Sequence, residues 1–286
     1  MNDQAELLRK RMTCIEQPEA KAIAVVNGKG GVGKSVFTVN FSIALGSFGK
    51  KVLIIDLDNG RGNIEYLLGI KAKSNFLEII KGSLPIHECV VQGPKQVSYV
   101  SGDGGFSELF HLDTKSLDTF LNQLDQLKSR YDFIIFNIGA GTSQGILSFI
   151  QAAHEIILVT NPEPTALADA YSILKLATLK DKNLPVSCVL NEVNNKREGQ
   201  QAWLKLSTVS KRFLNKDIEC LVTISRDKAV IRSVKEQHPC ILSQTSTIFA
   251  REIMTAAKQY LRCQKEKPVT SYRTFLTRLK KLIELG

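Results

Sequence analysis

The chain has 286 residues, of which 43% are hydrophobic and 23% are charged, and its formal net charge is +10. This balance is typical of a globular domain and excludes a disordered or fibrous chain. No apolar run approaches the roughly 20 residues of a membrane-spanning helix, and the polar N-terminus lacks the apolar core of a secretion signal. We therefore expect a cytoplasmic protein. Its positive charge serves solubility alone or suits an anionic partner such as phosphate, lipid or nucleic acid.

The elements expected along the chain alternate between short apolar strands and helices. The strands are expected at residues 22–27, 52–55, 133–136, 156–160 and 186–190, and helices at 35–48, 117–128 and 165–179. This order predicts a doubly wound α/β domain, with a mostly parallel sheet covered by helices on both faces and ligands bound at the carboxyl ends of the strands. Residues 194–199 are polar and are expected to form an exposed loop. We divide the chain into an N-terminal segment (1–20), the α/β domain (21–264) and a C-terminal helical appendage (265–286).

The strongest motif follows the first expected strand, where residues 28–35 read GKGGVGKS. It matches G-x-x-x-x-G-K-[ST] between a strand and a helix, which is the context that a phosphate-binding loop requires. Glycines let the backbone N–H groups turn toward phosphate oxygens, and the following helix adds its positive end. Lys34 is expected to contact the β and γ phosphates of ATP, and the Ser35 hydroxyl to ligate Mg²⁺. The nucleotide-binding residues of this segment are Gly28, Lys29, Gly30, Gly31, Val32, Gly33, Lys34, Ser35 and Val36.

A second lysine, Lys29, stands early in the same loop, where phosphate binding alone does not need it. The sequence K-G-G-V-G-K-S resembles the deviant Walker A motif of the MinD/ParA family of ATPases. In that family the early lysine crosses a dimer interface and contacts the nucleotide of the partner subunit. The resemblance implies that Lys29, together with Lys34, is catalytic and couples ATP binding to homodimer formation. Considered alone, a solvated loop lysine is the alternative for Lys29.

Two carboxylates follow the second expected strand, in the segment DLDNGRGN of residues 56–63. A carboxylate at a strand end beside a phosphate loop can hold Mg²⁺ through water or orient the attacking water. The segment resembles the first switch region of the family, D-x-D-x-G. The resemblance gives Asp58 the catalytic, water-positioning role and places Asp56 near the metal. On the residues alone, a pair of exposed turn carboxylates is the alternative.

Residues 132–143 read DFIIFNIGAGTS and lie where the family carries its Walker B strand and second switch. The family usually has an aspartate at the position of Asn137. An amide lacks the charge that a carboxylate offers to Mg²⁺, although it can accept a hydrogen bond from a metal-bound water. We therefore expect weak Mg²⁺ binding and slow hydrolysis, with loss of hydrolysis as the alternative. Gly139 and Gly141 indicate a flexible turn that senses the γ-phosphate.

Asn191 ends a later strand, in the sequence VLNEV. By resemblance to the family, it hydrogen-bonds adenine and completes the nucleotide-binding set. From the residues alone, a polar strand-end side chain is an equal alternative. The proline-containing base contact of the family is absent from residues 222–227, VTISRD, so base recognition departs from the family pattern.

Two further stretches resemble FlhG, the MinD-like regulator of flagellar number: NPEPTALADAY at residues 161–171 and DQAELLR at the N-terminus. In that group the N-terminal motif stimulates FlhF, a signal-recognition-type GTPase. The resemblance, which covers roughly residues 2–285, implies an FlhF-like GTPase and flagellar basal-body components as partners. On its own, the N-terminal segment is a short helix that folds on a partner or a loose tail. The implied partner-contacting residues are Asp3, Gln4, Leu7, Leu8 and Arg9.

The C-terminal residues 270–285, TSYRTFLTRLKKLIEL, have apolar side chains at helical spacing and basic residues between them. A basic amphipathic helix with aromatic residues fits the plane of an anionic membrane. A terminal helix packed on its own domain is the alternative, because an apolar stripe is usually core. MinD and FlhG proteins carry a similar membrane-targeting C-terminus, which favours the membrane. The membrane-contacting residues would be Tyr272, Phe275, Leu276, Leu279, Leu282 and Ile283.

The sequence thus predicts an ATP- and Mg²⁺-dependent dimerising ATPase that associates peripherally with the inner face of the cell membrane and regulates flagellar number or placement. One alternative is a ParA-type ATPase that positions DNA or other cargo, which the net charge of +10 permits. In that case the C-terminal helix and the N-terminal motif would have no purpose, so nucleic acid is not the expected partner. The other alternative is a degenerate nucleotide-binding scaffold with little hydrolysis, for which Asn137 argues.

Overall fold

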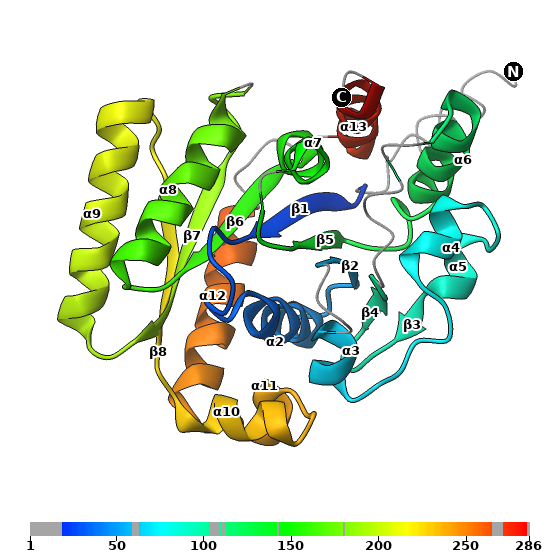
Figure 1. The fold of residues 1–286 in the computed structure, drawn as a ribbon. Coiled ribbons are helices and arrows are strands. Elements are labelled where there is room, and N and C mark those ends of the chain that lie inside the picture. Colours follow the sequence, from blue (N-terminus) through cyan, green and yellow to red (C-terminus); the bar gives the residue numbers. More distant parts are fainter. Residues whose placement is uncertain are drawn as a thin grey trace, which may run out of the picture.

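The computed structural model describes residues 19–58, 63–102, 109, 112–141, 143–179, 181–264 and 271–284. At its centre lies an eight-stranded sheet in the order β3-β4-β2-β5-β1-β6-β7-β8, whose strand pairs are parallel except for the antiparallel β3–β4 pair (Figure 1). The predicted doubly wound, mostly parallel α/β fold is therefore confirmed. The strands are β1 (Lys21–Val26), β2 (Val52–Leu57), β3 (Val91–Gln92), β4 (Val97–Val100), β5 (Phe133–Ile138), β6 (Glu155–Thr160), β7 (Val186–Val193) and β8 (Glu219–Ser225).

Helices cover both faces of this sheet (Figure 1). On one face α2 and α12 pack against each other. On the other, α13 packs between α6 and α7, α8 lies beside α7, and α9 lies beside α8. None of the helices in the described ranges is both long and apolar enough to cross a bilayer. The helices are α2 (Lys34–Ser47), α3 (Asn63–Leu68), α4 (Phe76–Ile80), α5 (Ile86–Cys89), α6 (Thr114–Asp125), α7 (Gln144–Ala152), α8 (Pro164–Thr178), α9 (Lys196–Leu214), α10 (Lys228–Lys235), α11 (Cys240–Ser243), α12 (Ile248–Gln264) and α13 (Tyr272–Glu284).

The central strands are apolar along their whole length because both of their faces are covered. In β1, Ala22 and Ala24 point into the core under α13 and α7, whereas Ile23 and Val25 point into the core under α2 and α12. Successive side chains of a strand point to opposite faces, so a strand buried on both sides has no polar position to spare. The carboxyl ends of β1, β2, β5, β6 and β7 meet at one edge of the sheet, which gathers the predicted site residues there.

The C-terminal helix α13 packs into the core of the domain rather than standing apart from it. Each of the six side chains assigned to a membrane contact is at most 9% exposed. The ring of Phe275 lies 5.1 Å from the ring of Phe136 on β5, and Tyr272 and Phe275 are adjacent at 5.3 Å. The hydroxyl of Tyr272 is buried without a hydrogen-bond partner among the described residues. The predicted helix and its single apolar stripe are thus present, but the stripe faces α6 and α7 in this state, as in the alternative of a helix packed on its own domain.

Polar contacts hold the start of α13 to the sheet. One carboxylate oxygen of Glu19 accepts hydrogen bonds of 2.6 Å from both the Ser271 hydroxyl and the Tyr272 backbone N–H. The Ala22 N–H donates to Nδ1 of His154 at 3.1 Å, so the proton of a neutral imidazole is on Nε2, which lies 3.2 Å from the Ser271 carbonyl oxygen. Burial, first of all, lowers the pKa of His154 to about 4, which keeps this histidine neutral.

One detail differs from the sequence-based expectations. The expected loop at 194–199 is wrong, because α9 begins at Lys196 and runs for five turns of helix to Leu214. The Asn195 side chain caps it by accepting a 3.0 Å hydrogen bond from the Glu198 N–H. The N-terminal partner residues Asp3, Gln4, Leu7, Leu8 and Arg9 lie outside the described residues.

Candidate nucleotide-binding site

The glycine-rich loop joins β1 to α2 at the carboxyl edge of the sheet. Gly31 and Gly33 both have φ +82°, a left-handed conformation that residues with a side chain rarely adopt. A Cβ atom on Gly33 would lie 2.2 Å from Nδ2 of Asn191, which itself donates a 2.9 Å hydrogen bond to the Val32 carbonyl oxygen. Only glycine therefore fits at Gly33, and the loop has the curled backbone that a phosphate-binding loop needs.

Lys34 is the first residue of α2, and its ammonium group is buried at the centre of the site. Its Nζ donates to Oδ1 of Asn137 at 2.7 Å and lies 3.0 Å from Oδ2 of Asp58. Burial lowers the pKa of Lys34, and the negative charges of Asp58 and Asp56 oppose that shift. The lysine therefore holds the Asp58 carboxylate and the Asn137 amide in place beside the phosphate loop.

Asn137, near the end of β5, connects the loop to Asp56. Its Nδ2 donates to Oδ1 of Asp56 at 2.8 Å and lies 3.4 Å from the Ser35 hydroxyl. Its Oδ1 also accepts a 3.2 Å hydrogen bond from Thr38, a residue that the motif did not single out. Burial raises the pKa of Asp56 to about 6, although the hydrogen bond from Asn137 and the charge of Lys34 oppose the increase.

The oxygens predicted to hold Mg²⁺ are of the kind that this ion prefers, and both lie next to Asn137. The Ser35 hydroxyl and the Asp56 carboxylate both approach the same nitrogen of Asn137, and hydroxyl and carboxylate oxygens are the ligands this hard cation prefers. Within the described residues, His, Cys, Asp and Glu form no group of three or more that could hold a metal ion alone. Mg²⁺ at Ser35 and Asp56 would therefore depend on phosphate oxygens and water for its remaining ligands.

The two predicted switch regions contact each other. The backbone N–H of Asp58 donates to Oδ1 of Asp56 at 3.2 Å, and the Asp58 side chain remains partly exposed at 23%. A Cβ atom on Gly139 would lie 2.7 Å from an oxygen of Asp58, so the first switch packs directly on the second. Gly141 has φ +148°, which is again a glycine conformation. A displacement of Asp58 would therefore change its contact with Gly139.

The side chain of Lys29 reaches the start of α8. Its Nζ contacts Oε2 of Glu163 at 2.6 Å and the hydroxyl of Thr165 at 3.1 Å, and both charged side chains are exposed. The hydrogen bond from Lys29 and its charge lower the pKa of Glu163. Glu163 and Thr165 were not predicted as site residues, although they lie in the 161–171 stretch that resembles FlhG. The structure brings this stretch, at the carboxyl end of β6, to the phosphate loop.

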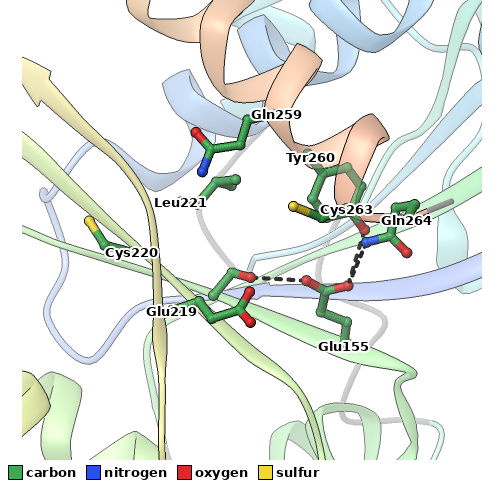
Figure 2. Close-up of a pocket in the computed structure, with 9 residues that line it drawn as sticks. Glu155, Glu219, Cys220, Leu221, Gln259, Tyr260, Cys263 and Gln264 are labelled. Atoms are coloured by element: carbon green, nitrogen blue, oxygen red, sulfur yellow. Dashed lines mark hydrogen bonds between the residues drawn. The ribbon is translucent and has the colours of Figure 1, made fainter. Parts of the chain in front are cut away.

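A separate cavity of about 370 Å³ lies at the opposite edge of the sheet, where β6, β7 and β8 begin (Figure 2). At its base, Glu155 is fully buried and accepts hydrogen bonds from Ser187, Tyr260 and Gln264. Lys21 also contacts the Glu155 carboxylate. These contacts connect α12 to the strands β1, β6 and β7, and they lie far from the predicted nucleotide site.

The glycine-rich loop, the buried lysine, and the hydroxyl and carboxylate oxygens around it define a P-loop nucleotide-binding protein of the doubly wound α/β class. A family described as an AAA domain matches residues 20–186. The chain is 30% identical over 217 residues to the antiactivator FleN of Pseudomonas aeruginosa, across 76% of this chain and 78% of FleN. It is also 30% identical over 247 residues to the flagellum site-determining protein YlxH of Helicobacter pylori, across 83% of each chain.

Among solved structures, the fold is similar to the septum site-determining protein MinD of Pyrococcus horikoshii in complex with Mg-ADP. The TM-score is 0.70 at 24% identity, across 88% of this chain and 100% of that one. The chain therefore belongs to the MinD/ParA family of P-loop ATPases, in the FlhG-like group of FleN and YlxH.

Proposed function

We propose that this protein is an ATP-dependent dimerising switch that associates with the inner face of the cell membrane and regulates the number or placement of flagella. The observation that carries the proposal is the phosphate loop with two lysines in different roles. Lys34 is buried among Asp58, Asp56 and Asn137, whereas Lys29 is exposed at the edge of the site. The flagellar role rests on the similarity to the flagellum site-determining protein YlxH and to the antiactivator FleN.

Each site residue has a task in ATP binding and hydrolysis. The loop N–H groups and Lys34 would bind the phosphates, and Asp58 would orient the attacking water. Mg²⁺ at Ser35 and Asp56 would supply charge neutralisation of the phosphates when bound. Because Asn137 offers no negative charge next to Asp56, we expect slow hydrolysis. A scaffold that binds nucleotide with little turnover is the second candidate, and Asn137 is the observation that favours it.

Dimer formation would require Lys29 to exchange one partner for another. In the monomer, its Nζ is bound to Glu163 and Thr165 at the rim of the site. A second subunit that presents its nucleotide to this rim would offer Lys29 a more strongly charged acceptor. Asn191 already donates one amide N–H to the phosphate loop. A contact with adenine would therefore use the remaining N–H or the oxygen of this amide, or would follow release of that hydrogen bond.

Membrane association would require α13 to leave its position between α6 and α7. The stripe that would enter the lipid surface is buried, whereas Arg273, Arg278 and Lys281 face solvent. One short helix contributes modest affinity, about 1 kcal/mol for each basic residue at an anionic surface. Two helices released from a dimer would bind far more tightly through their effective concentration. In the proposed cycle, ATP therefore favours the membrane-bound state and hydrolysis reverses it.

The first experiment measures phosphate release and oligomeric state of the purified full chain, with and without ATP and anionic liposomes. An ATP-dependent dimer that Lys34→Ala abolishes would support the switch, and Asp58→Ala should retain the dimer but stop turnover. A normal ATP-bound dimer with no phosphate release would favour the scaffold. Equal dimer formation by Lys34→Ala would contradict the assignment of the phosphate loop.

The membrane contact is tested without disturbing the core by reversing exposed charges on α13. Arg273→Glu combined with Lys281→Glu should weaken sedimentation with anionic liposomes in the presence of ATP. The matched control is Lys205→Glu combined with Lys258→Glu, which reverses two exposed charges on α9 and α12. Equal losses in both variants would mean general electrostatic attraction rather than a contact through α13.

The N-terminal segment is proposed to stimulate an FlhF-like GTPase. A peptide of residues 1–20 should accelerate GTP hydrolysis by that partner, and Leu7→Glu combined with Leu8→Glu should abolish the effect. The ParA-type alternative predicts instead that random duplex DNA binds the protein with strong salt dependence. Neither GTPase stimulation nor liposome binding would accompany that outcome.

A further inference from the structure

Asn137 is bonded at both ends of its amide. The oxygen accepts hydrogen bonds from the Lys34 ammonium at 2.7 Å and from the Thr38 hydroxyl at 3.2 Å. The nitrogen donates to the Asp56 carboxylate at 2.8 Å and lies 3.4 Å from the Ser35 hydroxyl. The side chain is fully buried. One neutral group therefore links the phosphate-binding lysine to the carboxylate expected to serve the metal.

Chemistry fixes the orientation of this amide. Turning it over would direct its NH₂ group at the ammonium of Lys34 and its oxygen at the carboxylate of Asp56, and both contacts would be repulsive. An aspartate at this position could still accept from Lys34. It could not donate to Asp56, because an ionised carboxylate carries no proton. An amide at this position therefore bonds both Lys34 and Asp56, whereas an ionised acid bonds only Lys34.

The charge of the site leads to the same conclusion. Lys34 contributes one positive charge, and Asp56 and Asp58 contribute one negative charge each. An acid in place of Asn137 would add a third negative charge, in contact with Asp56 and next to Ser35 of the phosphate loop. A divalent cation is the usual way to neutralise such a group of anions. With an amide at this position, less negative charge must be neutralised before the nucleotide can bind.

We propose that Asn137 takes over a cross-linking task that would otherwise fall to a divalent cation, so that this protein binds ATP with little dependence on Mg²⁺. The inference rests on the proposed nucleotide-binding function and assigns Asn137 as a positioning residue within it. Asn137 keeps Lys34 and Asp56 in their binding positions whether or not the cation is present. Nucleotide occupancy would then respond to ATP itself rather than to the Mg²⁺–ATP complex.

The test compares the affinity for a non-hydrolysable ATP analogue in saturating Mg²⁺ and in EDTA. For the wild-type chain the two dissociation constants should differ by less than about tenfold. Asn137→Asp should widen that ratio by about tenfold or more, chiefly by weakening binding in EDTA. Asn40→Asp is the matched control, since Asn40 is also buried but its amide contacts the backbone of Val36 and Ile241.

A second measurement needs no nucleotide. The melting temperature of Asn137→Asp should be lowered in EDTA and partly restored by Mg²⁺, whereas that of the wild type and of Asn40→Asp should not respond to Mg²⁺. A wild-type chain that binds the analogue only with Mg²⁺, or an Asn137→Asp variant with the wild-type ratio, would overturn the inference. A chain that binds no analogue in either buffer would overturn the nucleotide function itself, and the melting measurement keeps the two failures apart.

Discussion

Glu163 holds the ammonium group of Lys29 within the subunit that carries both residues. The pair is exposed, so its net contribution is small and is screened by salt. Yet the contact has a consequence for assembly, because Lys29 cannot bind Glu163 and a second subunit's nucleotide in full at the same time. In the proposed cycle, Glu163 and the nucleotide across the interface compete for one cation.

Glu163→Gln should therefore increase the fraction of dimer at a given ATP concentration. Loss of the carboxylate removes a competitor of modest strength, so we expect the dimer dissociation constant to fall by about two- to fivefold. Analytical ultracentrifugation at several protein concentrations measures it. Glu236→Gln is the control, since Glu236 forms an exposed ion pair with Arg232 on α10. A weaker dimer in Glu163→Gln would show that this carboxylate belongs to the interface instead.

His154 makes stability depend on pH. Burial lowers the pKa of this histidine to about 4, against 6.5 for the unperturbed side chain, so the unfolded chain binds a proton more readily than the folded one. The free energy of unfolding contributed by His154 is fully present above pH 6.5 and is lost as the pH falls toward 4. The hydrogen bond to the Ser271 carbonyl oxygen and the charge of Glu19 oppose this decrease in pKa, whereas the charges of Lys21 and Arg278 add to it.

The pH prediction is that urea midpoints of the wild type fall between pH 6.5 and pH 4 more steeply than those of His154→Gln. Glutamine can donate to the Ser271 carbonyl oxygen or accept from the Ala22 N–H but does not titrate. His87, which is exposed on α5, provides the control when it is replaced by glutamine. Parallel pH curves for wild type and His154→Gln would rule out this histidine as the source.

Single residues also explain which parts of the site could be found from sequence. Lys34 and Ser35 follow from a local motif whose spacing is its own evidence. Thr38 and Glu163 could not be found in this way, because each contacts a loop residue through the fold rather than through the motif. Asn137 was recognised as a departure from the family, but the two-sided bonding of its amide depends on where β2 and α2 place Asp56 and Lys34.

At the scale of elements, α13 illustrates a limit of pattern reading. A stripe of apolar side chains at helical spacing has the same sequence whether it faces a protein core or a lipid surface. The helix itself was therefore predictable, and its present neighbours were not. By contrast, β1, β2, β5, β6 and β7 were found because they are apolar on both faces. The edge strands β3 and β8, which include exposed positions, and the four-residue buried strand β4 were missed. The start of α9 was missed although its Asn195–Glu198 pair is a recognisable cap.

The docked position of α13 should respond to two substitutions in opposite directions. Glu19→Ala removes the acceptor for the first N–H of the helix and should raise liposome binding. Tyr272→Phe removes a buried hydroxyl that has no partner among the described residues, so it should favour docking by about 1 kcal/mol and lower liposome binding. Sedimentation with anionic vesicles measures both, and Glu88→Ala on the exposed side of α5 is the control. Identical liposome binding by the two variants would mean that the docking of α13 does not control membrane affinity.

At the scale of the whole molecule, α13 completes one of the two hydrophobic cores. Removal of residues 271–286 would expose the surfaces of α6 and α7 that it covers. We expect the truncated chain to lose at least about 3 kcal/mol of unfolding free energy, because six buried apolar side chains are removed. Urea denaturation followed by tryptophan fluorescence measures the loss. An unchanged midpoint would mean that the helix is a free appendage rather than part of the core.

Because the apolar stripe of α13 is buried inside each subunit, the amount of protein in the cell and the amount able to bind the membrane are two different quantities. In the proposed cycle, single subunits do not bind the membrane, since each keeps the apolar stripe of its own α13 covered. Paired subunits alone adhere, and while pairs are scarce their number rises with the square of the pool. The amount of protein on the membrane would then increase more than proportionally with the total amount of protein. A modest change in expression would therefore cause a larger change in membrane occupancy.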